Sequence, residues 1–211
     1  MTPSPKSRFL FLASLSLLAA AGLTGCGSNS FSFGGDTHNK MIVSVRDQKM
    51  LLVRDGTPVK SYKISTSKFG VGDRPGSNCT PLGRLQVAKK IGDRAAIGSV
   101  FKTRRPTGEI IKPNAPGRDP VVTRIMWLTG TESRNQNTFR RTIYIHGTPE
   151  EFRLGSPASF GCIRMGSRDV ADLYNRVGTG ADVFVIRGSI QTKKETNASA
   201  SVENSNDHSR G

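Results

Sequence analysis

The sequence predicts a mainly β fold, either a β-sandwich or a mixed sheet, with one main helix. Short apolar runs recur from residue 41 onward and are separated by Gly, Pro, Asn and Asp, which is typical of strands joined by turns. Only one stretch, near residues 167–178, shows apolar residues at the spacing of an amphipathic helix. No internal repeat interrupts this pattern, so a single sheet-rich domain is expected.

The first strands are expected to form a three-strand meander. Residues 41–45 and 50–53 are short apolar runs on either side of Asp47 and Gln48. Asp55-Gly56 is a strong signal for a two-residue hairpin turn, because both central positions of that turn need a positive φ. Residues 59–65 follow with partial alternation and predict the third strand.

The rest of the chain predicts four further strands and the helix. The helix is expected to start with Ser167 as its N-cap and to end at Gly178, with Asp169 in its first turn. Its apolar face consists of Val170, Leu173, Tyr174 and Val177. The further strands are expected at residues 84–89, 121–128, 142–146 and 182–186.

The N-terminus has the pattern of an export signal. A short basic segment with Lys6 and Arg8 precedes an apolar run over residues 9–22, which is short for a membrane-spanning helix. Leu23-Thr24-Gly25-Cys26 resembles the bacterial lipobox, which predicts cleavage after residue 25 and lipidation of Cys26. Several acyl chains would hold the protein at a bilayer. The alternative is an ordinary signal peptide, cut near Ala21.

Composition divides the remaining chain into three parts. Residues 26–39 are rich in Gly, Ser and Asn and predict a flexible tether. Residues 40–187 form the expected domain, and the polar residues 188–211 are expected to be a disordered tail. Of the three histidines, His38 lies in the tether and His208 in the tail, so neither is expected to be a catalytic base.

The chain is strongly basic, with a formal charge of +15. Cleavage after residue 25 would remove Lys6 and Arg8 but no acidic residue, leaving +13. Export argues against nucleic acid as the partner and favours anionic wall polymers, lipid headgroups or peptide carboxylates. The basic residues form no long run, so no binding patch is predicted, and solubility alone is a simpler explanation for the charge.

Two residues carry the predicted chemistry. His146 and Cys162 lie 16 positions apart, each beside a glycine, and His146 is the only histidine of the expected domain. A thiol needs a base to become a nucleophile near neutral pH. Cys162 is expected just before the helix, where backbone amides would lower its pKa and hold an oxyanion. A buried structural cysteine beside a hydrogen-bonded histidine is the alternative.

The surrounding residues resemble the L,D-transpeptidase catalytic domain, also called the YkuD-like family. His146-Gly147 and the segment Ser159-Phe160-Gly161-Cys162-Ile163-Arg164-Met165 match its signature, a His-Gly followed by Ser/Thr-His-Gly-Cys. Residues 41–56, 64–67 and Thr80-Pro81-Leu82-Gly83 match other family segments in order, so the resemblance covers nearly all of residues 41–187. One position departs: Phe160 replaces the usual histidine, and we expect it simply to pack.

The resemblance implies a cysteine acyltransferase that acts on peptidoglycan. Cys162 would be the nucleophile, His146 the general base, and the carbonyl of Gly147 the group that orients the imidazole. The amides of Gly161 and Cys162 would form the oxyanion hole. Ser159 would brace the loop or contact substrate, and Arg164 would meet a stem-peptide carboxylate.

The implied reaction forms a thioester with a tetrapeptide stem and then a 3→3 cross-link. If water or a protein lysine accepted the acyl group, the enzyme would instead be an L,D-carboxypeptidase or an anchoring enzyme. No cofactor and no metal are expected, and we expect a monomer. The predicted location is periplasmic and lipid-anchored, with Gly27 favouring the outer membrane.

The sequence leaves two other classes of protein possible, and it does not decide whether Cys79 and Cys162 form a disulfide. A cysteine peptidase of another fold would need a side-chain orienter for the histidine, such as Asn135 or Asn137. A non-catalytic wall-binding lipoprotein is the second class. Export permits disulfides, and a Cys79–Cys162 bond would silence the nucleophile, although we expect Cys79 to be a free thiol, either buried or semi-exposed.

Overall fold

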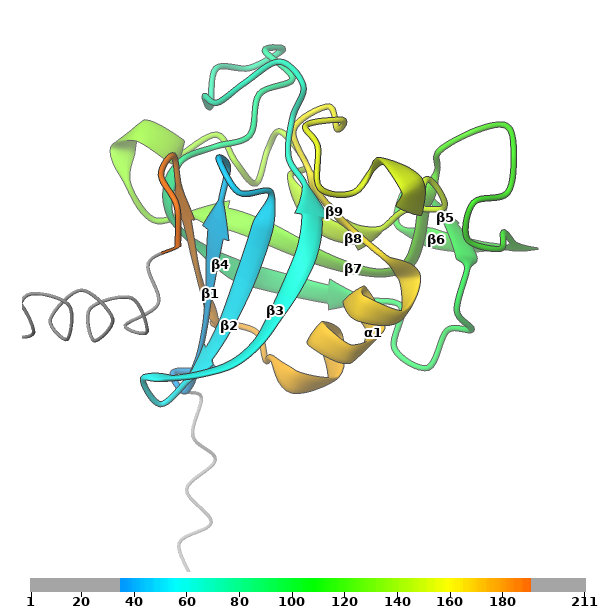
Figure 1. The fold of residues 1–211 in the computed structure, drawn as a ribbon, viewed down its shortest axis with the longest axis horizontal. Helices are drawn as coiled ribbons and strands as arrows, with labels where there is room; N and C mark the ends of the chain where they lie inside the picture. Colours follow the sequence, from blue (N-terminus) through cyan, green and yellow to red (C-terminus); the bar gives the residue numbers. More distant parts are fainter. Residues whose placement is uncertain (1–34, 191–211) are drawn as a thin grey trace, which may run out of the picture. The chain divides into compact units, whose positions relative to one another are not determined.

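The computed structural model describes residues 35–190 (Figure 1). The predicted signal peptide, lipidation site, most of the tether and most of the tail lie outside the described residues. Within residues 35–190, no helix has the length and apolar character that a membrane crossing requires.

One sheet of ten strands makes up most of the domain, as predicted from the recurring apolar runs. The strand order is β4-β10-β1-β2-β3-β9-β8-β7-β5-β6, and β4 also pairs with β7. This extra pairing closes the first eight strands into a ring, so the sheet corresponds to the mixed sheet of the prediction. The strands are β1 (Asn39–Ser44), β2 (Lys49–Arg54), β3 (Thr57–Ser65), β4 (Gly83–Ile91), β5 (Ser99–Lys102), β6 (Arg105–Ile110), β7 (Val121–Gly130), β8 (Tyr144–Gly147), β9 (Ile163–Met165) and β10 (Asp182–Ile186).

The predicted meander is confirmed. β1, β2 and β3 pair antiparallel in sequence order. Asp55 and Gly56 form the β2–β3 turn with φ angles of 49° and 81°, the positive values that a tight hairpin requires. Side chains of these strands alternate between core and surface, with Met41, Met50 and Leu52 fully buried.

Three strands were not predicted. β5 and β6 form a hairpin in which every residue of β6 is exposed, so no apolar alternation marks it. β9 has only three residues, all buried, and pairs parallel with β8 and antiparallel with β3. Through β9, the segment that follows Cys162 becomes a central strand of the sheet.

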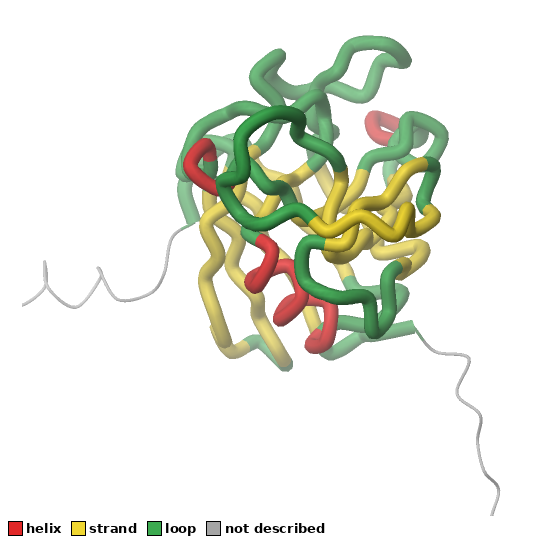
Figure 2. The backbone as a smooth tube through the Cα atoms, turned by 90° about the vertical axis from the view of Figure 1, so that its right-hand side faces the viewer, coloured by secondary structure: helices red, strands yellow, loops and turns green. Residues whose placement is uncertain are grey.

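Among residues 35–190 there is one α-helix, α1 (Ser167–Arg176), and it packs against β7 and β8. Val170, Leu173, Tyr174 and Val177 are buried in the main core, as predicted. Figure 2 shows the helix beside the strands, with loops gathered at the upper end of the domain.

The predicted N-cap of this helix was wrong by one residue. Gly166 is the N-cap and Ser167 is the first helical residue. The amide of Ser167 instead donates to the carboxylate of Glu151 at 2.7 Å, so a negative charge lies at the positive end of the helix. At the other end Val177 is the C-cap, one residue before the predicted stop.

Ordered contacts extend slightly beyond residues 40–187. The carboxylate of Asp36 accepts hydrogen bonds from the Gly178 amide at 2.6 Å and from the Asn39 side chain at 2.8 Å. At the other end, the Ile190 amide donates to Asp47 at 2.9 Å. The segments that flank the sheet are therefore bound to it where the structure describes them.

Candidate active site

His146 lies in β8, one of the central strands of the sheet. Its side chain is only 6% exposed. In the register between β8 and β9, His146 lies opposite Arg164 and Ile145 opposite Ile163. A rigid strand in the middle of the sheet therefore holds the imidazole.

The imidazole is oriented by its own strand. Nδ1 of His146 lies 2.8 Å from the carbonyl oxygen of Gly147. A carbonyl oxygen can only accept a hydrogen bond, so Nδ1 carries the proton and Nε2 of the neutral ring has its lone pair free. Burial lowers the pKa of His146, although this hydrogen bond and the charge of Asp119 act to raise it. The neutral base form therefore persists below the ordinary imidazole pKa.

Packing requires a glycine at position 147. A Cβ atom there would lie 2.6 Å from the carbonyl oxygen of Val122 and 3.1 Å from Val170 of the helix. The close approach of β7 and α1 leaves no space for any other residue. The predicted orienting role of Gly147 thus coincides with a packing constraint.

Cys162 lies immediately before β9, on the same face of the sheet as His146. Its Sγ lies 3.4 Å from the amide nitrogen of Tyr144, which donates to it, and 3.6 Å from the carbonyl oxygen of Thr142. Tyr144 and His146 are two residues apart in β8, so their side chains point to the same face. Cys162 is therefore diagonally across from His146.

The thiol is protonated in this resting arrangement. Burial raises the pKa of Cys162 to about 11, although the Tyr144 amide and the charges of Arg141 and Arg164 act to lower it. The predicted influence of the helix start was wrong, because β9 separates Cys162 from the first residue of α1. The helix start is therefore not among the groups that lower the pKa of this thiol.

The loop before Cys162 is held by hydrogen bonds. The hydroxyl of Ser159 donates to the carbonyl oxygen of Cys162 at 2.6 Å and accepts from the Gly161 amide at 3.2 Å. Of the two predicted roles of Ser159, this geometry corresponds to bracing the loop. The Gly161 amide, predicted to serve the oxyanion hole, is already engaged.

Gly161 has a conformation that favours glycine. Its φ is +117°, and a Cβ there would lie 3.1 Å from Ile143 and 3.2 Å from the carbonyl oxygen of Cys79. The carbonyl oxygen of Gly161 accepts a hydrogen bond from the Thr80 hydroxyl at 3.0 Å. The Thr-Pro-Leu-Gly segment that the sequence singled out therefore contacts the cysteine loop directly.

Arg141 fixes the neighbouring loop and was missed in the sequence. Its guanidinium donates to the carbonyl oxygens of Gly72 and Cys79 at 3.0 and 2.7 Å, and it pairs with Asp73 at 2.9 Å. The side chains of Arg141 and Asp73 are only 7% and 4% exposed. Their separation of 68 positions leaves no local signal in the sequence.

Cys79 has a free thiol, as predicted, and so does Cys162. The Sγ of Cys79 lies 3.1 Å from the carbonyl oxygen of Phe69. The structure therefore has no Cys79–Cys162 disulfide.

Arg164 is buried rather than open to a ligand. Its side chain is 4% exposed, and Nη1 pairs with Asp119 and, at 3.2 Å, with Glu150. Asp119, which also accepts a hydrogen bond from Thr148, was not identified from the sequence. Arg164 therefore links the loop after β6 to the strand beside His146, and this geometry does not favour its predicted direct contact with substrate. Its Nε and Nη2 atoms have no partner among the described residues.

Phe160 does not simply pack, contrary to the prediction. It is 63% exposed, at the rim of the site. Its ring centroid lies 5.4 Å from that of Phe69, which is 49% exposed.

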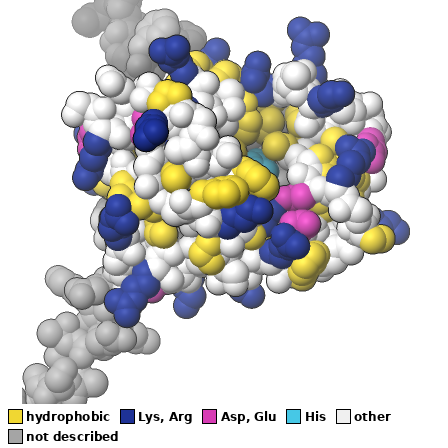
Figure 3. Space-filling model, turned by 90° about the horizontal axis from the view of Figure 1, so that it is seen from above, with side chains coloured by type: hydrophobic (Ala, Val, Ile, Leu, Met, Phe, Trp, Pro, Cys, Tyr) yellow, Lys and Arg dark blue, Asp and Glu magenta, His cyan; other side chains and the backbone are white. Residues whose placement is uncertain are grey.

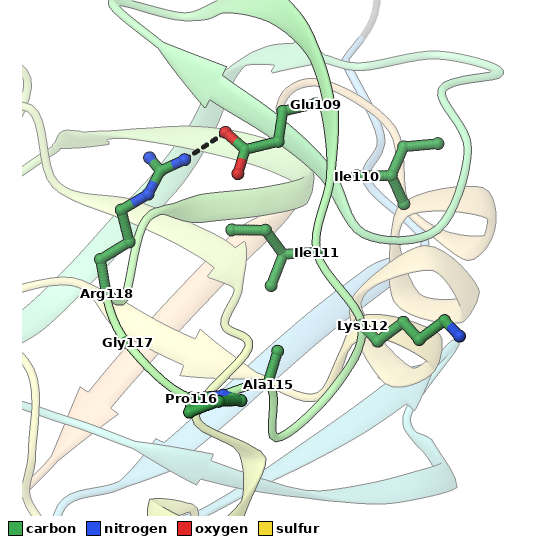
Figure 4. A pocket seen from close by; sticks show the side chains of 8 residues that line it. All are labelled: Glu109, Ile110, Ile111, Lys112, Ala115, Pro116, Gly117 and Arg118. Atoms are coloured by element: carbon green, nitrogen blue, oxygen red, sulfur yellow. Dashed lines mark hydrogen bonds and ion pairs between the residues drawn. The ribbon is translucent and has the colours of Figure 1, made fainter.

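Two open cavities lie in loops of the domain. One of about 580 Å³ is formed by residues 109–112 and 115–118 of β6 and the loop after it, where Arg118 pairs with Glu109 (Figure 4). Another of about 530 Å³ is lined by residues 71–77 and Cys79. Neither lining includes Cys162 or His146.

The alternative orienters predicted for another peptidase class do not reach the histidine. Asn135 donates to the carbonyl oxygens of Leu82 and Arg84, at 2.9 and 3.0 Å. Asn137 bonds to Asp73. Among residues 35–190, no group of three or more His, Cys, Asp or Glu side chains is arranged to hold a metal ion.

A backbone carbonyl thus orients a buried histidine on the sheet face that also bears a cysteine, in a mainly β domain. The chain belongs to the L,D-transpeptidase catalytic domain family, YkuD, whose family model matches residues 38–186.

Individual relatives match this chain over a short stretch or at low sequence identity. A stretch of 59 residues is 36% identical to the probable L,D-transpeptidase YcfS of Escherichia coli (strain K12), covering 28% of this chain and 18% of that protein. An L,D-transpeptidase structure from Mycobacterium tuberculosis H37Rv is 20% identical, with a TM-score of 0.46, over 71% of this chain and 58% of that one. One from Xylanimonas cellulosilytica is 18% identical, with a TM-score of 0.46, over 72% and 61%. The chain thus spans less than two thirds of these relatives.

Proposed function

We propose that this protein is a peptidoglycan L,D-transpeptidase in which Cys162 forms a thioester with a tetrapeptide stem. The observation that carries the proposal is the hydrogen bond between Nδ1 of His146 and the carbonyl oxygen of Gly147. It leaves Nε2 as a free base on the sheet face that also bears Cys162.

In the first half-reaction, Cys162 attacks the carbonyl carbon of the third stem residue. Because its pKa is raised to about 11, the thiol transfers its proton to Nε2 of His146 as the bond forms. The imidazolium then protonates the amine of the terminal D-alanine, which leaves. The product is an acyl-enzyme and a neutral imidazole.

In the second half-reaction, an amine from a neighbouring stem attacks the thioester. Nε2 accepts a proton from this amine, the C–S bond breaks, and the proton returns to the departing sulfur. The new amide is a 3→3 cross-link. The amide of Cys162 is the proposed oxyanion donor, because that of Gly161 is engaged by Ser159.

Purified protein incubated with disaccharide-tetrapeptide would test this reaction by liquid chromatography and mass spectrometry. We expect a cross-linked dimer that has lost one D-alanine, and no product from Cys162→Ala. A tripeptide product alone would indicate an L,D-carboxypeptidase instead. Absence of both products, with Cys162→Ala still complementing a deletion strain, would favour a non-catalytic wall-binding protein.

We also propose that Cys26 carries a lipid anchor that holds the domain at the outer membrane. The proposal rests on the residues 23–26 of the sequence. Metabolic labelling with a fatty-acid probe should modify the wild-type chain and not Cys26→Ser, and fractionation should release the variant from membranes. Equal labelling of both proteins would contradict this.

A further inference from the structure

An exposed aromatic pair lies at the rim of the candidate site. Phe160 and Phe69 are 63% and 49% exposed, with ring centroids 5.4 Å apart and planes inclined by 52°. Phe69 follows β3, whereas Phe160 lies two residues before Cys162. Their contact is therefore tertiary and is not set by the sequence alone.

A lysine lies beside both aromatic rings. Nζ of Lys68 lies 4.5 Å from the ring centroid of Phe160 and 5.3 Å from that of Phe69. These distances lie within the range of cation–π attraction. We name these three side chains, Lys68, Phe69 and Phe160, the aromatic platform.

The backbone beneath the platform is fixed. The amide of Lys68 donates to the carbonyl oxygen of Ser159 at 3.1 Å, and the amides of Ala158 and Ser159 donate to Thr66 at 2.9 and 3.0 Å. Because these bonds join the two segments, the platform is preorganised, and a ligand need not order it.

The platform lies close to the nucleophile. Two residues of extended chain span at most about 7 Å, so Phe160 begins within that distance of Cys162. The hydrogen bond from Ser159 to the Cys162 carbonyl shortens this path further. A substrate joined to Cys162 by a short peptide can therefore reach the rings with its next group.

From this arrangement we propose that the aromatic platform binds a sugar ring of the glycan strand that carries the donor stem. This inference rests on the proposed function. The flat C–H face of a sugar ring can cover an exposed phenyl ring, and the Lys68 ammonium can donate to a hydroxyl or acetamido oxygen. The backbone of the third stem residue and two further residues lie between the attacked carbonyl and the sugar and span about 10 Å when extended, a length comparable to the reach from Cys162 to a phenyl ring that begins up to about 7 Å away.

The surroundings agree with such a ligand. Figure 3 shows hydrophobic side chains near the centre of the face that bears these loops, with basic side chains around them. Phe160 replaces the histidine of the family pattern, which exchanges a hydrogen-bonding ring for an apolar one. The proposed sugar contact thus depends on a position at which this chain departs from the family pattern.

The test compares two donors, disaccharide-tetrapeptide and the same tetrapeptide without sugars. The variants are Phe69→Ala and Phe160→His, the second of which restores the family residue. Phe152→Ala is the matched control, because Phe152 is 68% exposed and has Arg153 at 5.7 Å from its ring centroid, yet lies outside the platform.

We expect both platform variants to lower kcat/KM about tenfold for the sugar-bearing donor and to leave the free tetrapeptide within about twofold. Phe152→Ala should change neither. An equal loss for both donors, or no loss for either, would overturn the proposal.

A binding measurement separates this inference from the proposed reaction. In the Cys162→Ala background, calorimetric titration should show that Phe69→Ala weakens binding of the disaccharide-tetrapeptide but not of the tetrapeptide. If the wild-type enzyme turns over neither donor, the proposed transpeptidase function fails, but this titration still tests whether the aromatic platform binds a sugar. Unchanged binding of the disaccharide-tetrapeptide by Phe69→Ala would then overturn the sugar-binding proposal.

Discussion

The imidazole of His146 donates from Nδ1 to the carbonyl oxygen of Gly147, the next residue in the same strand, at 2.8 Å. This bond fixes both the ring orientation and the tautomer without a carboxylate. Burial lowers the pKa of His146 and raises that of Cys162, so the pair at rest is a neutral imidazole and a thiol rather than a preformed thiolate–imidazolium pair.

Removing the base should abolish acylation with little structural change. For His146→Gln we expect acylation of Cys162 to slow by about 10²- to 10⁴-fold, the usual effect of losing a general base. Stopped-flow acylation by a carbapenem measures this rate. A rate within threefold of the wild type would contradict the assigned role of His146.

The protonation of His146 should also appear in stability. Its folded pKa lies below the unfolded value, so the unfolded chain binds the extra proton first as pH falls. Stability should therefore be fully present above about pH 6.5 and decline below it, by at most about 1.4 kcal/mol per pH unit.

Urea unfolding of wild type and His146→Gln between pH 7.5 and 5 measures this decline. The difference between the two proteins cancels the contributions of other groups, including His38. A difference that does not change with pH would show that the folded pKa of His146 is not lowered.

The Cys162 thiol should react slowly with a small electrophile at neutral pH. With its pKa raised to about 11, alkylation by iodoacetamide should keep increasing beyond pH 9. Peptide mapping distinguishes Cys162 from the other free thiol, Cys79. A plateau of Cys162 alkylation near neutral pH would indicate a preformed thiolate instead.

Asp119 should act as a positioning residue through Arg164 and Thr148. Asp119→Asn removes the charge that pairs with the buried guanidinium, so the free energy of unfolding should fall by about 1–3 kcal/mol. Asp119 also raises the pKa of His146, so the acidic limb of the kcat/KM profile should move to lower pH.

Glu150→Gln is the matched control for this effect. Glu150 shares Arg164 with Asp119, at 3.2 Å, but is not among the charges that shift the pKa of His146. For Glu150→Gln we expect a lower free energy of unfolding and an unchanged acidic limb of the kcat/KM profile. The same shift in both variants would mean that the effect reaches His146 through Arg164 alone.

Gly161→Ala should strain the loop that carries the nucleophile. The positive φ and the contacts with Ile143 and Cys79 together predict a loss of about 1–3 kcal/mol in unfolding free energy. Gly76→Ala isolates the φ contribution, because Gly76 has φ +77° and a Cβ atom there would have no neighbour within 4 Å. Equal losses at both sites, measured by urea unfolding, would exclude a contribution from the contacts.

Local patterns in the sequence predicted the meander and the helix, and they singled out His146 and Cys162 as the candidate reacting residues. The Asp55-Gly56 turn and the face around Leu173 each depend on neighbours a few positions away. β6 was not predicted because all of its residues are exposed, so it has no apolar alternation. β9 was not predicted because it has only three residues.

The parts of the site that were missed depend on distant residues. Arg164 and Asp119 are 45 positions apart, so their ion pair, which buries the arginine, has no local pattern. The same is true of Arg141 and Asp73. Phe160 was expected to pack because a phenyl ring is apolar, whereas its partner is another exposed ring.

The central claim is that Cys162 is the nucleophile and His146 its base. Mass spectrometry of the reduced protein after incubation with a carbapenem tests it most directly. We predict one covalent adduct, mapped to Cys162, that is absent from Cys162→Ala and forms far more slowly in His146→Gln. No adduct in the fully reduced wild-type protein, or an adduct that persists in Cys162→Ala, would contradict the claim.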